Sequence, residues 1–268
     1  MNISRIYAIF LRQFYLARDN PTRLFQIFMW IILDIIEWGF ISKYLSNIVG
    51  SGFGLVSALL GAAILAGFLS RVMQGVTTSF FEDIWSHNFL NLFASPISVL
   101  EYITGLVLTS ISTSALGLIV MLLLATTIFG FSVFVYGISL ITFLTILFLF
   151  GIALGIIGVS IVLKLGPSGE WFVWPIPALL SPFMGVFYPL STLPQWMQFV
   201  GHLLPPSYVF ENVRAIVAGK GFSSIDLTAG IILSLVYIVL AYGIFWIVYR
   251  KAIRTGLIAR YSAESVGD

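Results

Sequence analysis

The chain has 268 residues, of which 59% are hydrophobic and only 9% are charged, and its net charge is +2. Soluble domains carry about 25% charged residues, so this composition and the mean hydropathy of +1.05 indicate an integral membrane protein. The chain has no cysteine, which excludes disulfides, thiolate nucleophiles and cysteine-ligated metals. The two histidines, His87 and His202, are too far apart in sequence to suggest a zinc site, so we expect no metal and no bound cofactor.

Residues 1–23 are expected to form an amphipathic helix on the membrane surface. The basic residues are spread along this segment, unlike those of a cleavable signal peptide: Arg5, Arg12, Arg18 and Arg23. Apolar residues recur between them at helical spacing: Ile3, Ile6, Tyr7, Phe10, Leu11 and Phe14. The alternative is a cationic tail without a regular structure, but the apolar stripe favours the helix.

Six apolar segments follow, and runs of about 20 apolar residues are long enough to cross a hydrocarbon core of roughly 30 Å. The expected spans are Leu24–Tyr44, Phe53–Phe80, Val99–Phe129, Val133–Leu163, Trp171–Tyr188 and Thr228–Tyr249. The predicted fold is therefore an all-α integral membrane protein with six transmembrane helices. It forms a single transmembrane domain over residues 1–268, with the bundle at 24–249 and a tail at 250–268.

The distribution of Lys and Arg predicts the orientation of these spans. Six spans place both termini on the same side, and nine basic residues lie on that side. Only Lys43, Arg214 and Lys220 lie on the opposite side. Basic residues concentrate in cytosolic segments, so we expect a multi-pass protein of the plasma membrane with both termini in the cytosol.

The segment FFEDIWSHNFLNLFASPIS, residues 80–98, is expected to be cytosolic although it contains two acids and no Lys or Arg. Its apolar residues follow helical spacing along one face: Phe81, Trp85, Phe89, Leu92 and Phe93. Its polar residues follow another face: Asp83, His87 and Asn91. This pattern predicts an amphipathic helix parallel to the membrane that ends before Pro96. The acids Glu82 and Asp83 suggest a surface for a protein partner of complementary charge.

The fifth span is expected to be broken and partly re-entrant on the external side. It and the residue that follows it contain four prolines, which remove helical hydrogen bonds: Pro175, Pro177, Pro182 and Pro189. Irregular backbone at membrane depth is tolerated only where protein or a water-lined cavity satisfies the freed groups. Another helix follows Pro205 and Pro206, and within it Glu211 and Arg214 are spaced for a local ion pair.

Three charges are expected inside the membrane. Asp34 and Glu37 lie three residues apart in the first span, and Arg71 lies in the second span and is a candidate counter-ion. An acid at mid-membrane costs about 2.5 to 3.5 kcal/mol on insertion scales, so these residues should face a cavity or a partner helix. They could form a structural polar pair, line a translocation route, or act as a proton relay.

Glycine and serine cluster in the third and fourth spans, as in FGIALGIIGVS, and small residues allow helices to approach closely. Packing within the chain is favoured over a dimer seam. The sequence contains no G-x-x-x-x-G-K-[ST] motif, so a process that consumes ATP would need a second chain.

The ordered elements PLSTLPQW, LLPPSY and ENVRAIVAGKG, within residues 189–221, resemble the end of the permease subunits of type-2 ABC exporters. Residues 82–102 resemble the cytosolic helix of the same family, although residues 86–91 depart from its usual Gly-Thr and Leu-Glu pattern. The resemblance covers nearly the whole chain. The PLSTLPQW element is more similar to drug and lipo-oligosaccharide exporters than to exporters of long polysaccharides.

This resemblance implies a permease that moves a hydrophobic or amphipathic substrate outward, such as a drug-like molecule, a lipid or a lipid-linked glycan. The implied partners are membrane lipid, a second permease in a homo- or heterodimer, and two ABC ATPase subunits that hold ATP and Mg, but no nucleic acid. The implied coupling helix contacts the ATPase through Glu82, Asp83, Trp85, His87, Phe89 and Leu92. The external re-entrant element is assigned Pro189, Pro194, Trp196, Pro205, Tyr208, Glu211 and Arg214.

The alternative function is an ion- or proton-coupled secondary transporter that uses Asp34 and Glu37. A membrane-embedded transferase would need a convergent cluster of acid, base and nucleophile. The sequence offers no such cluster, so no catalytic residue is expected.

Overall fold

The computed structural model describes residues 2–19, 21–49, 53–86, 92 and 95–255, and these residues form helices, turns and loops without a strand. In chain order the helices are α1 (Ile3–Arg18), α2 (Pro21–Val49), α3 (Phe53–Trp85), α5 (Val99–Phe129), η1 (Val133–Tyr136), α6 (Ser139–Leu165), η2 (Pro167–Gly169), α7 (Glu170–Val173), α8 (Ile176–Met184), η3 (Leu190–Thr192), α9 (Gln195–His202), α10 (Pro205–Val217) and α11 (Ser224–Arg254).

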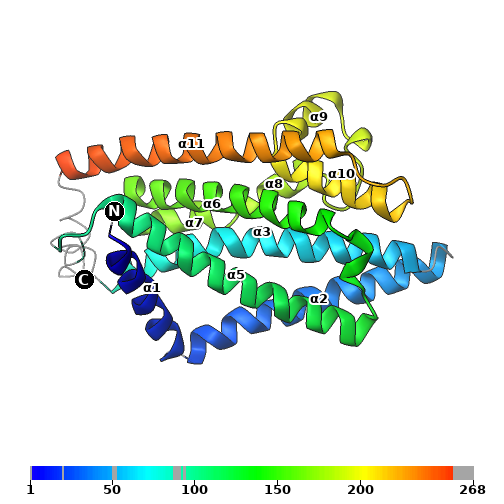
Figure 1. Ribbon diagram of the computed structural model, residues 1–268, viewed down its shortest axis with the longest axis horizontal. Coiled ribbons are helices and arrows are strands. Elements are labelled where there is room, and N and C mark those ends of the chain that lie inside the picture. The colour runs from blue at the N-terminus through cyan, green and yellow to red at the C-terminus, as the bar shows by residue number, and fades with distance from the viewer. Residues whose placement is uncertain (1, 20, 50–52, 87–91, 93–94, 256–268) are drawn as a thin grey trace.

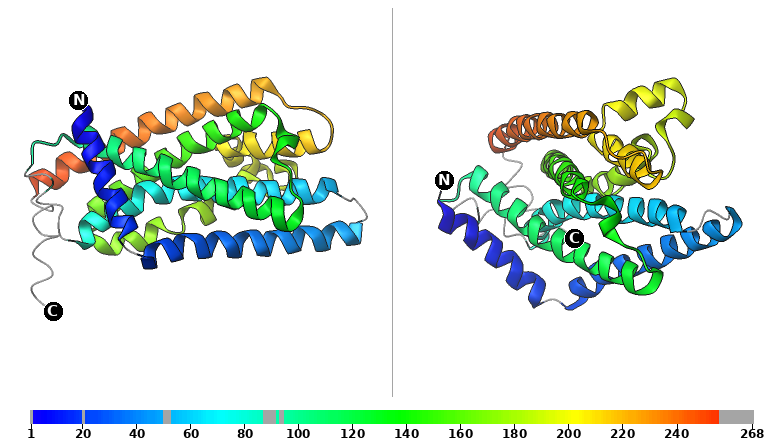
Figure 2. Two further views of the ribbon diagram at one scale, coloured as in Figure 1. Left: turned by 60° about the horizontal axis from the view of Figure 1, so that its bottom comes forward. Right: turned by 45° about the vertical axis from the view of Figure 1, so that its right-hand side comes forward.

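The long helices α2, α3, α5, α6 and α11 run along the long axis of the molecule (Figure 1). At one end, α1 lies steeply inclined to them, beside the end of α3 and the start of α5 (Figure 2). We call this the α1 end. At the opposite end, α9 and α10 gather beside the start of α11 (Figure 1). We call this the α10 end.

Four helices in the described part of the chain are long and apolar enough to cross a membrane: residues Val56–Trp85 of α3, and all of α5, α6 and α11. The all-helical membrane fold is therefore confirmed in its coarse form, whereas six spans remain a prediction. Helix α2 contains the predicted first span, begins before it and ends after it, and carries Asp34, Glu37 and Lys43.

The bounds of α5 agree with the prediction, while the start of the fourth span was wrong. Ser98 caps α5 together with Glu101, and Gly130 ends it with a φ of 67°. The fourth helix begins at Ser139 and not at Val133, because a short 3-10 helix and Gly137, with a φ of 53°, separate it from α5.

The predicted fifth span is not one continuous helix. It consists of α7, of four residues, and α8, of nine residues, which ends at Gly185 with a φ of 62°. Pro175 stands between the two helices and Pro182 lies within α8. The break that the prolines predicted is therefore present.

Small residues bring α3 into close contact with α5 and α6. A Cβ atom added to Gly75 would lie 2.7 Å from the Cα of Ser110 in α5. Cβ atoms added to Gly151 and Gly155 of α6 would each lie 2.8 Å from a valine Cβ of α3. The Ser110 hydroxyl also donates a hydrogen bond of 2.7 Å to the Val72 carbonyl. For Gly151, Gly155 and Ser110, the interpretation as packing within the chain is confirmed.

Helix α3 ends at Trp85, five residues after the predicted end of the second span at Phe80. Residues 81–85 contain no glycine or proline that would interrupt the helix. Phe81 and Ile84 are buried in the core, so the helix also has a packing reason to continue. The prediction of a separate helix lying on the membrane from Phe81 onward was therefore wrong for residues 81–85, and 87–91 and 93–94 lie outside the described residues.

Candidate functional site

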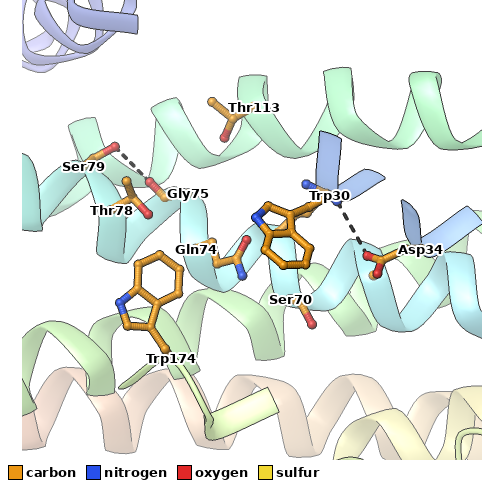
Figure 3. Close-up of a pocket in the computed structure, with 11 residues that line it drawn as sticks. Trp30, Asp34, Ser70, Gln74, Gly75, Thr78, Ser79, Thr113 and Trp174 are labelled. Carbon is orange, nitrogen blue, oxygen red and sulfur yellow. Dashed lines mark hydrogen bonds and ion pairs between the residues drawn. The ribbon is translucent and has the colours of Figure 1, made fainter. Parts of the chain in front are cut away.

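A cavity of about 520 Å³ lies between α2, α3, α5 and the linker that joins α7 to α8 (Figure 3). Its lining combines two tryptophans, an ion pair and several hydrogen-bonding groups: Trp30, Asp34, Gly67, Ser70, Arg71, Gln74, Gly75, Thr78, Ser79, Thr113 and Trp174. The cavity begins midway along α3 and extends toward the α1 end. It therefore presents polar groups within a largely apolar lining.

One face of α3 supplies most of this lining. The contributing residues recur three or four positions apart: Gly67, Ser70, Arg71, Gln74, Gly75, Thr78 and Ser79. Residues at this spacing lie on the same side of a helix, and from Gly67 to Ser79 they cover about 18 Å of its length. Sequence reasoning singled out Arg71 but missed the rest of the stripe. The helical period of polar residues within an apolar span was the signal that could have found it.

The cavity contains the ion pair of Asp34 and Arg71, whose Oδ2 and Nη2 atoms are 4.0 Å apart. Arg71 comes from α3 and Asp34 from α2, so the counter-ion interpretation of Arg71 agrees with the structure. Glu37 is exposed on α2 and does not belong to the lining. Of the three predicted intramembrane charges, the structure therefore brings two together.

The indoles of Trp30 and Trp174 form aromatic walls of the cavity. Trp30 precedes Asp34 by four residues on α2, so both project from the same helix face. Trp174 comes from the linker after α7, and its ring lies 6.1 Å from that of Phe81. In the view of Figure 3 the Gln74 side chain lies between the two indoles.

At the α1 end, the Asp83 carboxylate joins three helices. Arg12 of α1 donates a hydrogen bond to Asp83 Oδ1 and forms an ion pair with it. The Tyr102 hydroxyl of α5 donates a hydrogen bond of 2.6 Å to Asp83 Oδ2. Asp83 and Tyr102 are buried. The expectation that Asp83 offers its charge to a partner protein was wrong, because its charge is neutralised within the chain.

Glu101 makes a second connection between α1 and α5. Its carboxylate accepts hydrogen bonds from the backbone N–H groups of Asn2, at 2.6 Å, and Ser98, at 2.9 Å. It also lies 3.5 Å from the Arg5 guanidinium. One acid thus interacts with the first turns of two helices, where a negative charge is favourable.

The predicted N-terminal helix is present, and its side chains divide between the core and the exterior. Ile6, Ile9 and Gln13 are buried, and the Gln13 amide donates a hydrogen bond of 3.1 Å to the Ser79 carbonyl. An exposed apolar stripe remains on another face: Ile3, Tyr7 and Phe14. Its contact with the membrane surface remains a prediction.

Trp85 connects the last turn of α3 to α7. Its indole N–H donates a hydrogen bond of 2.6 Å to Glu170 Oε1. Burial raises the pKa of Glu170 above its usual range, although the hydrogen bond from Trp85 acts in the opposite direction. Trp174, which lines the cavity, follows Glu170 by one helical turn, and its backbone N–H donates to the Glu170 carbonyl at 3.2 Å. The end of α3 and the cavity wall are therefore connected through α7.

The residues predicted for the coupling surface differ in their exposure. Trp85 is half-exposed, Glu82 is partly buried, and Leu92 packs against the core. His87 and Phe89 lie outside the described residues.

At the α10 end, Glu211 and Arg214 form the expected ion pair, with Oε1 and Nη2 2.8 Å apart. They also bind the chain that follows α8. The Leu190 N–H donates to Glu211 at 2.7 Å, and Arg214 donates to the Gly185 carbonyl at 2.6 Å. We call these two residues and their contacts at 185–190 the α10 clamp.

The other residues predicted for this element shape its turns. Pro189 and Pro194 immediately precede η3 and α9, and Pro205 is the first residue of α10. The Tyr208 hydroxyl donates to the His202 carbonyl at 2.9 Å, and the Trp196 ring lies 6.1 Å from that of Phe183. The predicted residues are therefore brought together in one compact element.

A comparison with curated proteins finds no match. The sequence model of the family described as ABC-2 type transporter matches residues 4–218, which extend from α1 to the end of α10. This match covers the cavity, the connections at the α1 end and the α10 clamp. The chain therefore belongs to the ABC-2 type transporter family, in which it is a membrane-embedded transport component.

Proposed function

We propose that this chain is the permease subunit of an ATP-driven exporter and that its substrate passes through the cavity between α2, α3 and α5. The observation that carries the proposal is the position of this cavity midway along α3, a helix that can cross a membrane. Its volume of about 520 Å³ lies within the range of small-molecule sites, about 300–1,000 Å³. The outward direction and a hydrophobic or amphipathic substrate follow from the resemblance to exporters of drugs, lipids and lipid-linked glycans.

A second permease subunit, identical or different, is the proposed partner across the cavity. The Asp34 side chain is 54% exposed. A carboxylate that faces lipid at mid-membrane would cost about 2.5 to 3.5 kcal/mol. A second subunit or the water of a shared pathway would remove this cost, which supports a dimer in which α2 faces the centre.

Two ABC ATPase subunits, which hold ATP and Mg, are proposed to bind at the α1 end. The sequence has no nucleotide-binding loop of its own. Glu82 and the half-exposed Trp85 lie on the last turns of α3, where an ATPase could contact them. With this assignment the chain lies in the plasma membrane, and the α1 end and both termini face the cytosol. The α10 clamp then lies on the external side, and the broken segment 170–184 leads toward it from α7, which contacts the end of α3.

The test is ATP hydrolysis by the purified chain in lipid nanodiscs, alone and mixed with an ATPase encoded next to it. We expect hydrolysis to need the ATPase and to change when the permease is added. Glu82→Lys should weaken the association, whereas Asp226→Lys, a similar charge change at the α10 end, should not.

Two results would contradict the proposal. If no ATPase associates with the chain, the permease function is wrong and an ion- or proton-coupled transporter using Asp34 and Glu37 becomes the better hypothesis. If both lysine variants bind the ATPase as the unchanged chain does, the coupling surface is not at Glu82.

A further inference from the structure

The two charges in the cavity are not equally accessible. The Asp34 side chain is 54% exposed, whereas that of Arg71 is 11% exposed. The carboxylate is therefore the more accessible of the two charges. The pair is neutral as a whole, but it presents its negative member to the substrate.

The packing of Arg71 keeps its side chain in this recessed position. A Cβ atom added to Gly117 of α5 would lie 2.9 Å from the Cδ of Arg71 and 3.6 Å from the Cδ1 of Ile31. The arginine stem thus passes through a narrow space between α2 and α5 that exists because residue 117 has no side chain. The stem of Arg71 is therefore confined, while its guanidinium reaches the cavity lining beside Asp34.

The remaining lining residues favour a positive charge or are neutral. Trp30 is 64% exposed and Trp174 is 43% exposed, so both can present indole to a bound molecule. The faces of tryptophan rings attract cations within about 6 Å of the ring centroid. Apart from Arg71, the described lining has no Lys or Arg, and its other polar members are hydroxyl and amide groups. The exposed Glu37, three residues after Asp34, adds negative potential beside the cavity.

We infer that the cavity binds lipophilic cations, in which an ammonium-like or phosphonium-like centre contacts Asp34 and apolar groups pack on Trp30 and Trp174. The inference rests on the proposed function, since it names the class of substrate that the permease carries. Burial of the positive centre between a carboxylate and two indoles compensates for its lost hydration, and Arg71 keeps the empty cavity close to neutral.

A matched pair of probes tests this inference. Tetraphenylphosphonium and tetraphenylborate have nearly the same size and shape and opposite charges. Binding of each is measured to the purified chain in nanodiscs of zwitterionic lipid, with empty nanodiscs subtracted. We expect saturable binding of the cation and none of the anion.

Variants then locate the site. Asp34→Asn should weaken binding of the cation about tenfold, because the carboxylate no longer attracts it. Asp34→Glu should retain most of the binding, and Asp226→Asn, which removes an exposed acid at the α10 end, should retain all of it. Trp30→Leu should weaken binding severalfold, whereas Trp246→Leu on α11 should not. Elution of each variant as a single folded species is required before its binding is interpreted.

Saturable binding of the anion, or equal binding of the cation by the Asp34→Asn variant and the unchanged chain, would overturn the inference. The probe pair gives this answer for the unchanged chain even if a variant fails to fold. The assay contains no ATPase, so its failure leaves the permease function intact. Conversely, if the cation binds in this assay but no ATPase associates with the chain in the hydrolysis experiment, the permease function is wrong and the cation site stands.

Discussion

Arg12 of α1 and Asp83 of α3 form an ion pair between residues 71 positions apart in the sequence, and the carboxylate of this pair is completely buried. Arg12→Ala would leave a buried carboxylate with only the hydrogen bond from Tyr102. Removing one member of a buried pair typically costs about 3 kcal/mol or more. We expect a lower temperature of unfolding in nanodiscs, measured by circular dichroism, and faster protease cleavage after α1.

Arg18→Ala provides the matched control for this change. Arg18 is exposed in the last turn of the same helix, so its loss should alter stability by less than about 0.5 kcal/mol. Equal unfolding temperatures for the two variants would show that the Arg12–Asp83 pair does not hold α1 in place.

Gly105 of α5 lies against Ile9 of α1. A Cβ atom at this position would lie 2.7 Å from the Cβ and Cγ2 of Ile9. Gly105→Ala should therefore displace α1 and destabilise the protein by about 1–3 kcal/mol. Gly243→Ala on α11 is the control, since its added methyl would meet nothing within 4 Å. It should be neutral or stabilising by up to about 1 kcal/mol. The packing argument fails if the two alanine variants unfold at the same temperature.

The hydrogen bond between Trp85 and Glu170 can be measured with a double-mutant cycle. Trp85→Phe removes the N–H donor and Glu170→Ala removes the acceptor, so the double variant should lose less stability than the sum of the single changes. We expect a coupling free energy of about 0.5–1.5 kcal/mol, obtained from unfolding in nanodiscs. Glu170→Gln keeps an acceptor oxygen and should be milder than Glu170→Ala. Additive losses would mean that α7 is not connected to α3 by this bond.

The stability of the α10 clamp is expected to depend on the guanidinium geometry of Arg214 and not only on its positive charge. Its two terminal nitrogens bind different groups, Nη1 the Gly185 carbonyl and Nη2 the Glu211 carboxylate. A lysine ammonium cannot reproduce this planar geometry, so Arg214→Lys should lose about 1–3 kcal/mol. Protease cleavage between α8 and η3 should become faster. Lys220→Ala, which removes an exposed base at the same end, should cleave at the original rate, and identical rates for both variants would contradict the α10 clamp.

Local signals in the sequence explain which helices were predicted correctly. Helix α5 has a serine cap before its first residue and a glycine with positive φ after its last, so its bounds agreed with the prediction. Gly137 gave a similar signal before α6 that was overlooked. The prolines of segment 170–184 remove hydrogen bonds from the helix in which they lie. The break was predictable because this effect is local in the sequence.

The environment of Asp83 could not be predicted in the same way. Its spacing from His87 suggested a shared polar helix face, but its burial depends on Arg12 and Tyr102, which belong to other helices. Nothing in the sequence near residue 83 indicates these contacts. The cavity could be predicted only in part. The polar stripe on α3 follows a helical period and is visible in the sequence, whereas the position of the Arg71 side chain depends on its contact with Gly117 of α5.

The position of α1 has a consequence for the order in which the protein is assembled during synthesis. This helix leaves the ribosome before Asp83, Glu101 and Gly105, to which it binds. At rates of about 5–20 residues per second, it waits roughly 5–20 s for these partners. During this delay its buried-face residues Ile6 and Ile9 have no protein to cover them. We therefore expect α1 to bind the lipid interface next to the translocation machinery during synthesis. It would then pack against α3 and α5 once those helices have been inserted.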